Sequence, residues 1–459
     1  MPTDEKPNII EGHFWLPDEE SRRFYGRLEH DLDRGVRLHL VGSNLTELSP
    51  DGPIRPGPVD VIYGEALGGV PLTLQGVYPA RWRISGLGGS GHDDVVDGFA
   101  DRLLRGAHVP VEEEPQAAMA RSSLKGLREF LIGGTVDGGP LAVPADDLAA
   151  EVLNVSLRDG TSLLLIAERR PMLGPIDQSS EVVAAAQWTF DPALPLSEVE
   201  ERWIGPLQDL VLFATRSQSY VTGLGIDSDP SELHSSLGIL RRANPRPREV
   251  PDVYALALNL RHVPDPGEVI RSWFELRDRV GPVWGLFFSA LDRPESLLED
   301  RLLGLLAFAE GCDRALRDTA PLTDEEEKAA KKAVREALTD KRVRGIYSGA
   351  INHANSWTLR ERLDHQIATA MESLDEFWDL DAELFSEQLS DTRNWLVHWG
   401  KRGANVVTDG QGMVDLVRSL IVVLYVNILR QLGLDAEAAA DVIASGWRLE
   451  QLPLVERRG

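Results

Sequence analysis

The first half of the chain alternates short apolar runs with Gly, Pro, Asn and Asp, from Gly12 to about Gly225. This texture is typical of strands joined by turns. Residues 27–30 and 36–41 alternate apolar and polar positions on either side of Asp33, and they predict a hairpin. Further strands are predicted at residues 61–65, 70–74, 163–167, 184–190 and 219–226. The pattern therefore predicts a mainly β domain, either a sandwich or an irregular barrel.

Two stretches of this half have the spacing of helices instead, residues 117–132 and 197–215. The half also contains several large aromatic side chains. Because an indole ring buries a large apolar area, we expect these rings in the core of the β domain rather than against a ligand. They are Trp15, Trp82, Trp188 and Trp203.

The second half changes to a period of about 3.6 residues from Glu295 onward, which predicts amphipathic helices. Helices are predicted at residues 297–308, 324–339, 358–377, 382–399, 412–432 and 436–447. Gly311, Gly400 and Gly433 stand where helix-ending glycines belong. This half therefore predicts an all-α bundle.

Linker-like sequence separates the two patterns, at the Pro-rich residues 244–248 and again at residues 264–266. We place the domain boundary after this sequence, with a β-rich domain at 1–285 and a helical domain at 286–459. The predicted class is α+β multidomain, which suits a chain of 459 residues.

The composition excludes several classes of protein. The formal net charge of -25 opposes non-specific binding of nucleic acid, so any RNA must meet a local basic patch. The densest basic cluster, residues 328–344, is interpreted as a solvated helix face. The single cysteine, Cys312, and the absence of a zinc-type spacing predict neither a disulfide nor a metal site, and no cofactor motif stands out.

The chain is also expected to work in the cytoplasm, without a membrane. Its first residues do not resemble a signal peptide. The most apolar run, Leu420 to Leu429, is shorter than the roughly 20 residues that cross a bilayer. We expect a buried helix there.

One helix carries a candidate catalytic cluster near its end, namely Arg393, Asn394 and His398. On a helix, Asn394 and His398 lie about 40° apart, whereas Arg393 lies about 140° from His398. One rigid helix cannot aim all three side chains at one point, so helical flexing, the long reach of arginine or a second copy of the helix across a dimer interface must complete the site.

These residue types suit RNA cleavage without a metal ion. The reaction needs a base for the ribose 2′-hydroxyl, an acid for the 5′-oxygen and a cation for the phosphorane charge. Histidine exchanges protons near neutral pH, and arginine presents two parallel donors to phosphate oxygens. His398 is assigned as the general base and Arg393 as the phosphate ligand, with Asn394 orienting them.

The position of this cluster, late in a helical module and before the apolar helix at 412–432, resembles the HEPN superfamily, whose ribonucleases carry Arg, a polar residue, three further residues and His. The resemblance implies a metal-independent endoribonuclease that acts as a homodimer and leaves a 2′,3′-cyclic phosphate. Only Arg393, Asn394 and His398 match this motif as catalytic residues. Glu310, His353 and His365 are considered as assisting residues.

The N-terminal half carries a second resemblance. Residues 12–17 and 24–28, then 62–65 and 70–74, are similar to the opening of ApeA-type anti-phage proteins. The resemblance implies an abortive-infection effector that cleaves RNA, with tRNA as one candidate, after its N-terminal domain senses a phage-derived trigger that the sequence does not identify.

Three alternatives stay open. The helical domain fits a catalytically silent HEPN scaffold that dimerises and binds a ligand or partner, and the β domain fits a carbohydrate or peptide binder by fold analogy. The Gly-rich residues 85–94 could cradle a phosphate or, through Ser90, His92 and Asp94, imitate a hydrolase triad, but a loop without such a role is the favoured interpretation.

Overall fold

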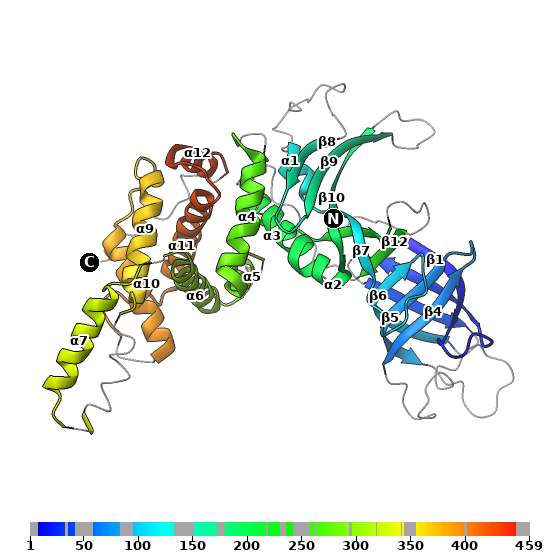
Figure 1. The fold of residues 1–459 in the computed structure, drawn as a ribbon, viewed down its shortest axis with the longest axis horizontal. Coiled ribbons are helices and arrows are strands. Elements are labelled where there is room, and N and C mark those ends of the chain that lie inside the picture. Colours follow the sequence, from blue (N-terminus) through cyan, green and yellow to red (C-terminus); the bar gives the residue numbers. More distant parts are fainter. Residues whose placement is uncertain are drawn as a thin grey trace. The chain divides into compact units, whose positions relative to one another are not determined.

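The computed structural model divides the chain into two compact units, Met1–Gly267 and Glu268–Gly459. It describes residues 8–32, 35–41, 58–82, 95–132, 151–171, 180–216, 219–229, 236–241, 258–260, 263–292, 296–317, 319–340, 342–343, 355–398 and 402–446. Each unit is described by itself. The first is β-rich and the second is helical, as the sequence pattern predicts (Figure 1).

Six antiparallel strands of the first unit close into a barrel (Figure 1). They are β1 (Asn8–Trp15), β2 (Phe24–Asp31), β3 (Gly35–Val41), β4 (Val59–Ala66), β5 (Pro71–Trp82) and β6 (Val95–Arg105). The order is β3-β2-β1-β4-β5-β6, and pairing of β3 with β6 closes the ring. The predicted hairpin is confirmed, because β2 pairs with β3, and the strands predicted at residues 61–65 and 70–74 pair with each other as β4 and β5.

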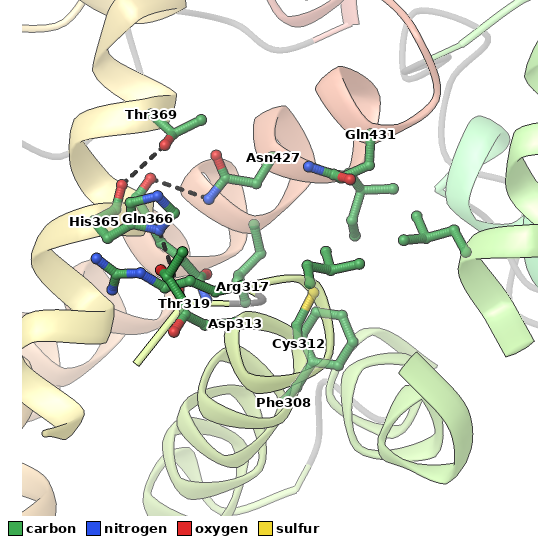
Figure 2. Close-up of a pocket in the computed structure, with 14 residues that line it drawn as sticks. Phe308, Cys312, Asp313, Arg317, Thr319, His365, Gln366, Thr369, Asn427 and Gln431 are labelled. Atoms are coloured by element: carbon green, nitrogen blue, oxygen red, sulfur yellow. Dashed lines mark hydrogen bonds and ion pairs between the residues drawn. The ribbon is translucent and has the colours of Figure 1, made fainter. Parts of the chain in front are cut away.

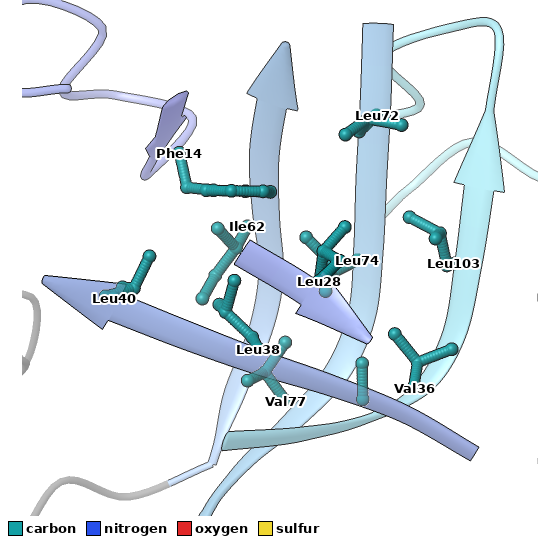
Figure 3. Packing of buried hydrophobic residues seen from close by; sticks show 11 residues of the cluster. Phe14, Leu28, Val36, Leu38, Leu40, Ile62, Leu72, Leu74, Val77 and Leu103 are labelled. Atoms are coloured by element: carbon teal, nitrogen blue, oxygen red, sulfur yellow. The ribbon is translucent and has the colours of Figure 1, made fainter. Parts of the chain in front are cut away.

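Alternate residues of these strands fill the barrel interior (Figure 3). Phe14, Leu28 and Leu74 are fully buried there. The Phe14 ring lies so close to Gly64 that a Cβ at that glycine would stand 2.5 Å from ring atom Cδ1. Gly64 is therefore required by a close approach rather than by a turn. The period-2 burial pattern explains why the sequence identified these strands.

The sheet continues beyond the barrel through β6 in the order β12-β11-β7-β10-β9-β8. These strands are β7 (Gln116–Leu124), β8 (Glu151–Ser156), β9 (Ser162–Pro171), β10 (Ser180–Pro195), β11 (Val221–Asp227) and β12 (Ser236–Arg241). Four short helical segments accompany them, α1 (Leu127–Ile132), α2 (Leu196–Glu198), the π-helix η2 (Val199–Ile204) and α3 (Gly205–Thr215). Trp15, Trp188 and Trp203 are buried, as expected.

Two expectations for the chain's local structure are wrong. Residues 117–132 do not form one helix, because residues 116–124 are the strand β7 and only Leu127–Ile132 is helical. Gly311 does not end a helix, because it lies within the helix α6 (Leu298–Leu316). The linker-like residues 264–266 adjoin the division between the units after Gly267, and Pro266 begins the helix α4 (Pro266–Val280). Proline suits the first turn of a helix, where its missing N–H has no intrahelical partner. The helix α5 (Trp284–Asp292) was also not predicted.

The helical unit contains α4 from Glu268 onward, the 3-10 turn η5 (Gly281–Val283), α5 and the helices after it. These are α6 (Leu298–Leu316), α7 (Asp324–Ala337), α9 (Leu359–Leu374), α10 (Ala382–His398), α11 (Gly410–Gln431) and α12 (Ala436–Gly446). A cluster of aromatic rings joins α4, α5, α6 and α11 in the core. Its members are Trp273, Trp284, Phe287, Phe288, Phe308 and Tyr425.

Among the described residues, α11 alone is long and apolar enough to cross a membrane by length and composition. Its most apolar window is 72% buried within the unit. Residues such as Leu420, Val423 and Leu429 pack against α6 and α9. The helix therefore forms the centre of the bundle.

Helices α7 and α9 begin with the same capping box, but loss of the cap should affect the stability of the protein only at α9. Thr358 and Glu361 exchange hydrogen bonds at the start of α9, as Thr323 and Glu326 do at the start of α7. Because α9 buries one face, Thr358→Ala should lower the free energy of unfolding by about 1 kcal/mol in urea titrations. Helix α7 buries no residue, so Thr323→Ala should fray it locally and leave global unfolding unchanged.

Hydrogen bonds from Thr358 lower the pKa of Glu361 below its ordinary value of 4.5. The stabilisation from the Glu361 carboxylate is therefore present above pH 4.5 and is lost as pH falls through the lowered pKa. Equal effects of Thr358→Ala and Thr323→Ala would contradict this account of the two helices.

Candidate active site

Helix α10 positions the candidate cluster. Its buried residues, Leu384, Phe385, Leu389 and Thr392 among them, recur at helical spacing and face the rest of the bundle. Asp381 precedes the helix and accepts a hydrogen bond from the Leu384 amide at 3.0 Å. The cluster lies outside this buried stripe, so the same periodicity that anchors α10 presents Arg393, Asn394 and His398 at its surface.

The structure brings two of the three residues together. An Nη1 hydrogen of Arg393 is donated to Oδ1 of Asn394 at 3.2 Å. Arg393 is half-buried, whereas Asn394 and His398 are exposed. His398 is the last residue of α10, one turn after Asn394, and it makes no hydrogen bond to either residue among the described contacts. The Arg393 side chain therefore hydrogen-bonds to Asn394, and it makes no described hydrogen bond to His398.

The charge of Arg393 is not neutralised by a carboxylate among the described residues. Other arginines of this unit do form ion pairs, such as Arg314 with Glu310 at 2.9 Å and Arg360 with Asp364 at 3.1 Å. The guanidinium of Arg393 therefore offers a positive charge at a surface helix of a protein whose net charge is -25. The remaining N–H groups of Arg393 can donate to phosphate oxygens while its Nη1 donates to Asn394.

The segment between α10 and α11 is fixed against α10 beside the cluster. The buried hydroxyl oxygen of Thr392 accepts a hydrogen bond from the Val407 amide at 3.0 Å. Asn405 Nδ2 donates to the Glu387 carboxylate at 3.0 Å. Asp409 then caps α11 by accepting from the Gly412 amide at 2.7 Å. These contacts hold the described part of the connection, residues 402–409, in one place.

The possible assisting residues have other partners or lie outside the described part. Glu310 pairs with Arg314. His365 Nδ1 lies 3.0 Å from Asp313 Oδ1. His353 and the Gly-rich residues 85–94 lie outside the described residues, as does Trp399. Within the described ranges, no three His, Cys, Asp or Glu side chains come together as a metal site.

The helical unit contains a buried ion pair that the sequence did not predict. Arg362 Nη1 donates to Asp313 Oδ2 at 2.7 Å, and their side chains are only 7% and 1% exposed. The sequence pattern could have revealed this pair, because Asp313 and Arg362 each occupy a position on the apolar, core-facing side of an amphipathic helix. A charge at such a position requires a buried partner.

Comparison with known families matches both units. A family model described as ApeA N-terminal domain 1 matches residues 9–273, more than half of the chain. The chain belongs to the ApeA family. A second model, Apea-like HEPN, matches residues 303–438 and includes the whole candidate cluster. No curated protein and no solved structure shows a significant match to the chain.

These matches confirm two predictions for this ApeA protein, the family resemblance and the fold class of a β-rich N-terminal region followed by a HEPN helical bundle. The closed barrel decides between the sandwich and the barrel for strands β1–β6. The structural division after Gly267 lies before the expected boundary at 285/286, so α4 and α5 belong with the helical unit.

Proposed function

We propose that this ApeA protein is a metal-independent endoribonuclease of an abortive-infection system against phage. The observation that supports this most directly is the unpaired guanidinium of Arg393, held beside Asn394 at the surface of α10 and one helical turn before His398. The family match to Apea-like HEPN agrees with RNA as the substrate class, and tRNA is one candidate.

In the proposed reaction, His398 removes the proton from a ribose 2′-hydroxyl and the resulting oxygen attacks the adjacent phosphorus. Arg393 binds the phosphate oxygens and stabilises the charge that grows on them. The 5′-oxygen leaves with a proton, which gives a 2′,3′-cyclic phosphate and a 5′-hydroxyl. Asn394 positions the guanidinium through the 3.2 Å hydrogen bond.

In the candidate cluster, α10 of one chain carries a single side chain that exchanges protons near neutral pH, His398, which is assigned as the base. The acid that protonates the 5′-oxygen must therefore come from elsewhere. We propose that a homodimer formed through the HEPN unit brings a second copy of α10 to the site. The two copies together then provide two histidines and two arginines, enough for a base, an acid and the phosphate ligands.

The first test is incubation of the purified protein with total RNA in excess EDTA, followed by mapping of the new RNA ends. We expect cleavage that leaves 2′,3′-cyclic phosphate ends. Cleavage that requires added metal, or ends that carry 3′-hydroxyls, would contradict the proposed chemistry. If the purified protein is silent, the same ends should be sought in RNA from phage-infected cells that express it in their cytoplasm.

We also propose that the N-terminal unit restrains the HEPN unit until a phage-derived trigger is sensed. The division into two compact units, each matched by its own family model, supports separate roles. A chain beginning at Pro266, the first residue of α4, should cut RNA faster than the full chain if the restraint is real. A folded truncation with unchanged or lower activity would contradict the restraint but not the nuclease.

A further inference from the structure

Helix α7 buries none of its residues, unlike α6, α9, α10 and α11 of the same unit. Figure 1 shows α7 projecting from these helices. An isolated helix of this length is only marginally stable in water. Its own capping box and ion pairs between adjacent turns support it, so its faces do not depend on the bundle. Beyond its anchored start, α7 is therefore accessible to a partner.

The start of α7 is fastened to the unit by polar contacts. The Asn355 side chain accepts a hydrogen bond from the Leu322 amide at 2.7 Å and donates to the Leu322 carbonyl oxygen at 3.0 Å. It also donates to the Glu327 carboxylate at 3.2 Å. The acidic first turn of α7 is therefore the end that the unit holds.

The chain that leads into α7 is also fixed where it leaves α6. Arg317 stacks over the Trp357 ring at 3.8 Å, and Trp357 Nε1 donates to the Thr319 carbonyl oxygen at 2.7 Å. Figure 2 shows Arg317 and Thr319 at a pocket between α4, α6, α9 and α11, whose wall also includes Asn427. These contacts set the direction in which the chain enters α7.

One face of α7 is basic over two turns. Its members are Lys328, Lys331, Lys332 and Arg335. Their spacing of i, i+3, i+4 and i+7 spans about 100° of the helix circumference. Lys331 pairs with Glu327, and Lys332 lies 4.0 Å from Glu336. Lys328 and Arg335 form no ion pair with a carboxylate of the described residues, so this basic face keeps a net positive charge.

The helix macrodipole does not account for the basic face. It favours cations only in the last turn of a helix, whereas Lys328 lies in the second turn of α7. Residues 328–344 contain seven basic and two acidic residues in a chain of net charge -25. Such a local excess of positive charge is complementary to a polyanion, which the rest of the chain repels.

The opposite face of α7 argues against a membrane as this polyanion. It consists of Ala330, Ala333 and Ala337, and the neighbouring Val334 is the largest apolar side chain of the helix. Amphipathic helices that bind membranes carry Trp, Phe or Leu on their apolar face. Because α7 has none of these residues, its partner is determined by charge, and RNA phosphates fit better than a lipid surface.

The anchored end of α7 is connected to α10 through the start of α9. Asn355 precedes α9 by four residues. Arg360, in the first turn of α9, donates to the Glu383 carbonyl oxygen at 3.3 Å and lies 3.6 Å from the Glu387 carboxylate. Both glutamates belong to the first half of α10. Helix α7 therefore projects from the part of the unit that holds the helix with the candidate cluster.

We propose that the basic face of α7 is the docking site for the RNA substrate. The inference rests on the proposed function, since RNA is taken as the substrate. Lys328 and Arg335 bind phosphates other than the scissile one, which Arg393 binds. Phosphate contacts position a nucleic acid without reading its bases, so this docking is independent of sequence. It weakens as salt rises, because each contact releases condensed counterions.

Fluorescence anisotropy with a mixed-sequence 2′-O-methyl RNA oligonucleotide tests the docking without cleavage, because the blocked 2′-oxygen cannot attack phosphorus. The full chain should bind this probe saturably. Lys328→Ala and Arg335→Ala should each lower the slope of log affinity against log salt by about 0.7, which corresponds to about fivefold weaker binding near 0.1 M salt. Because α7 buries no residue, neither substitution should disturb the fold.

Two variants are matched controls. Arg314→Ala removes an exposed cation from α6, and Ala333→Gln changes the opposite face of α7 without changing its charge. Both should bind the probe as the parent does. Equal weakening by either control would overturn the proposal, as would unchanged binding by Lys328→Ala and Arg335→Ala together. Binding of the parent to phosphatidylglycerol vesicles and not to the probe would overturn it as well.

Cleavage kinetics separate this proposal from the proposed nuclease. On an RNA that the parent cuts, the combined Lys328→Ala and Arg335→Ala variant should raise KM far more than it lowers kcat, because it removes binding shared by substrate and transition state. If the parent cuts RNA in EDTA and the α7 variants bind the probe normally, only the docking site is wrong. If probe binding depends on α7 but no RNA is cut, the docking site stands and the nuclease proposal fails.

Discussion

Replacing His398 by alanine should lower the rate of RNA cleavage by about 10²–10⁴-fold, the range expected when a general base is removed. Arg393→Ala should lower it by about 10²–10³-fold, because the phosphate loses a preorganised cation. Arg393→Lys keeps the charge but not the paired donors, so it should recover only part of the rate. Initial rates on the RNA cut by the parent protein measure all three variants.

Because His398 and Arg393 lie at the surface of α10, their variants should change activity without changing stability. His398 is exposed, and Arg393 contacts a neighbour on its own helix, so neither variant should change the unfolding curve. Matched controls are His13→Ala, an exposed histidine of the barrel, and Arg314→Ala, an exposed arginine of α6. Full activity in His398→Ala would rule out the proposed base, and equal losses in the controls would point to a general effect of mutation.

The largest effect on stability is expected at the buried pair of Asp313 and Arg362. Asp313→Ala should lower the free energy of unfolding by about 3–5 kcal/mol, because the Arg362 guanidinium is then buried without its partner. Urea titrations followed by far-UV circular dichroism measure the change. The loss should fall in the transition of the helical unit, since both residues belong to it.

A surface pair supplies the control for this prediction. Asp364 pairs with Arg360 on α9 across one helical turn, and its side chain is 48% exposed. Asp364→Ala should therefore cost only about 0.3–0.5 kcal/mol. If Asp313→Ala is no more destabilising than Asp364→Ala, the loss of Asp313 does not leave a buried, unpaired charge on Arg362, and the prediction is wrong.

The sequence predicted α7, α9, α10, α11 and α12 to within three residues at each end, and all of these except α7 bury apolar residues at a regular spacing. It did not predict α4 or α5, and α6 extends eight residues past its predicted end at residue 308. It failed at residues 117–132, where β7 and α1 follow one another and small, mixed residues fit either period. It failed again at Gly311, which was interpreted as a helix end although α6 continues through it to Leu316. Local pattern cannot distinguish these cases, since tertiary packing decides them.

The sequence proposes the residues of the candidate site but does not give their geometry. Motif spacing proposes Arg393, Asn394 and His398, and helical angles indicate that one helix does not aim all three side chains at one point; in the structure Arg393 bonds to Asn394 and not to His398. The hydrogen bond from Arg393 to Asn394 depends on side-chain rotamers. The hydrogen bond from the Val407 amide to Thr392 depends on the path of the chain between α10 and α11. Neither follows from periodicity. The pocket lined by Asn427 and Arg317 arises from four helices and has no linear motif.

The single cysteine, the half-buried Cys312, also makes the protein convenient for spectroscopy. A thiol whose pKa is raised to about 12 is almost entirely protonated near pH 7, so maleimide dyes should react with it slowly. Cysteines introduced at exposed positions, for example Val397→Cys on α10 and Tyr78→Cys on the barrel, should then label selectively without removal of Cys312. Energy transfer between two such dyes would report the separation of the two units directly, and its change during phage infection.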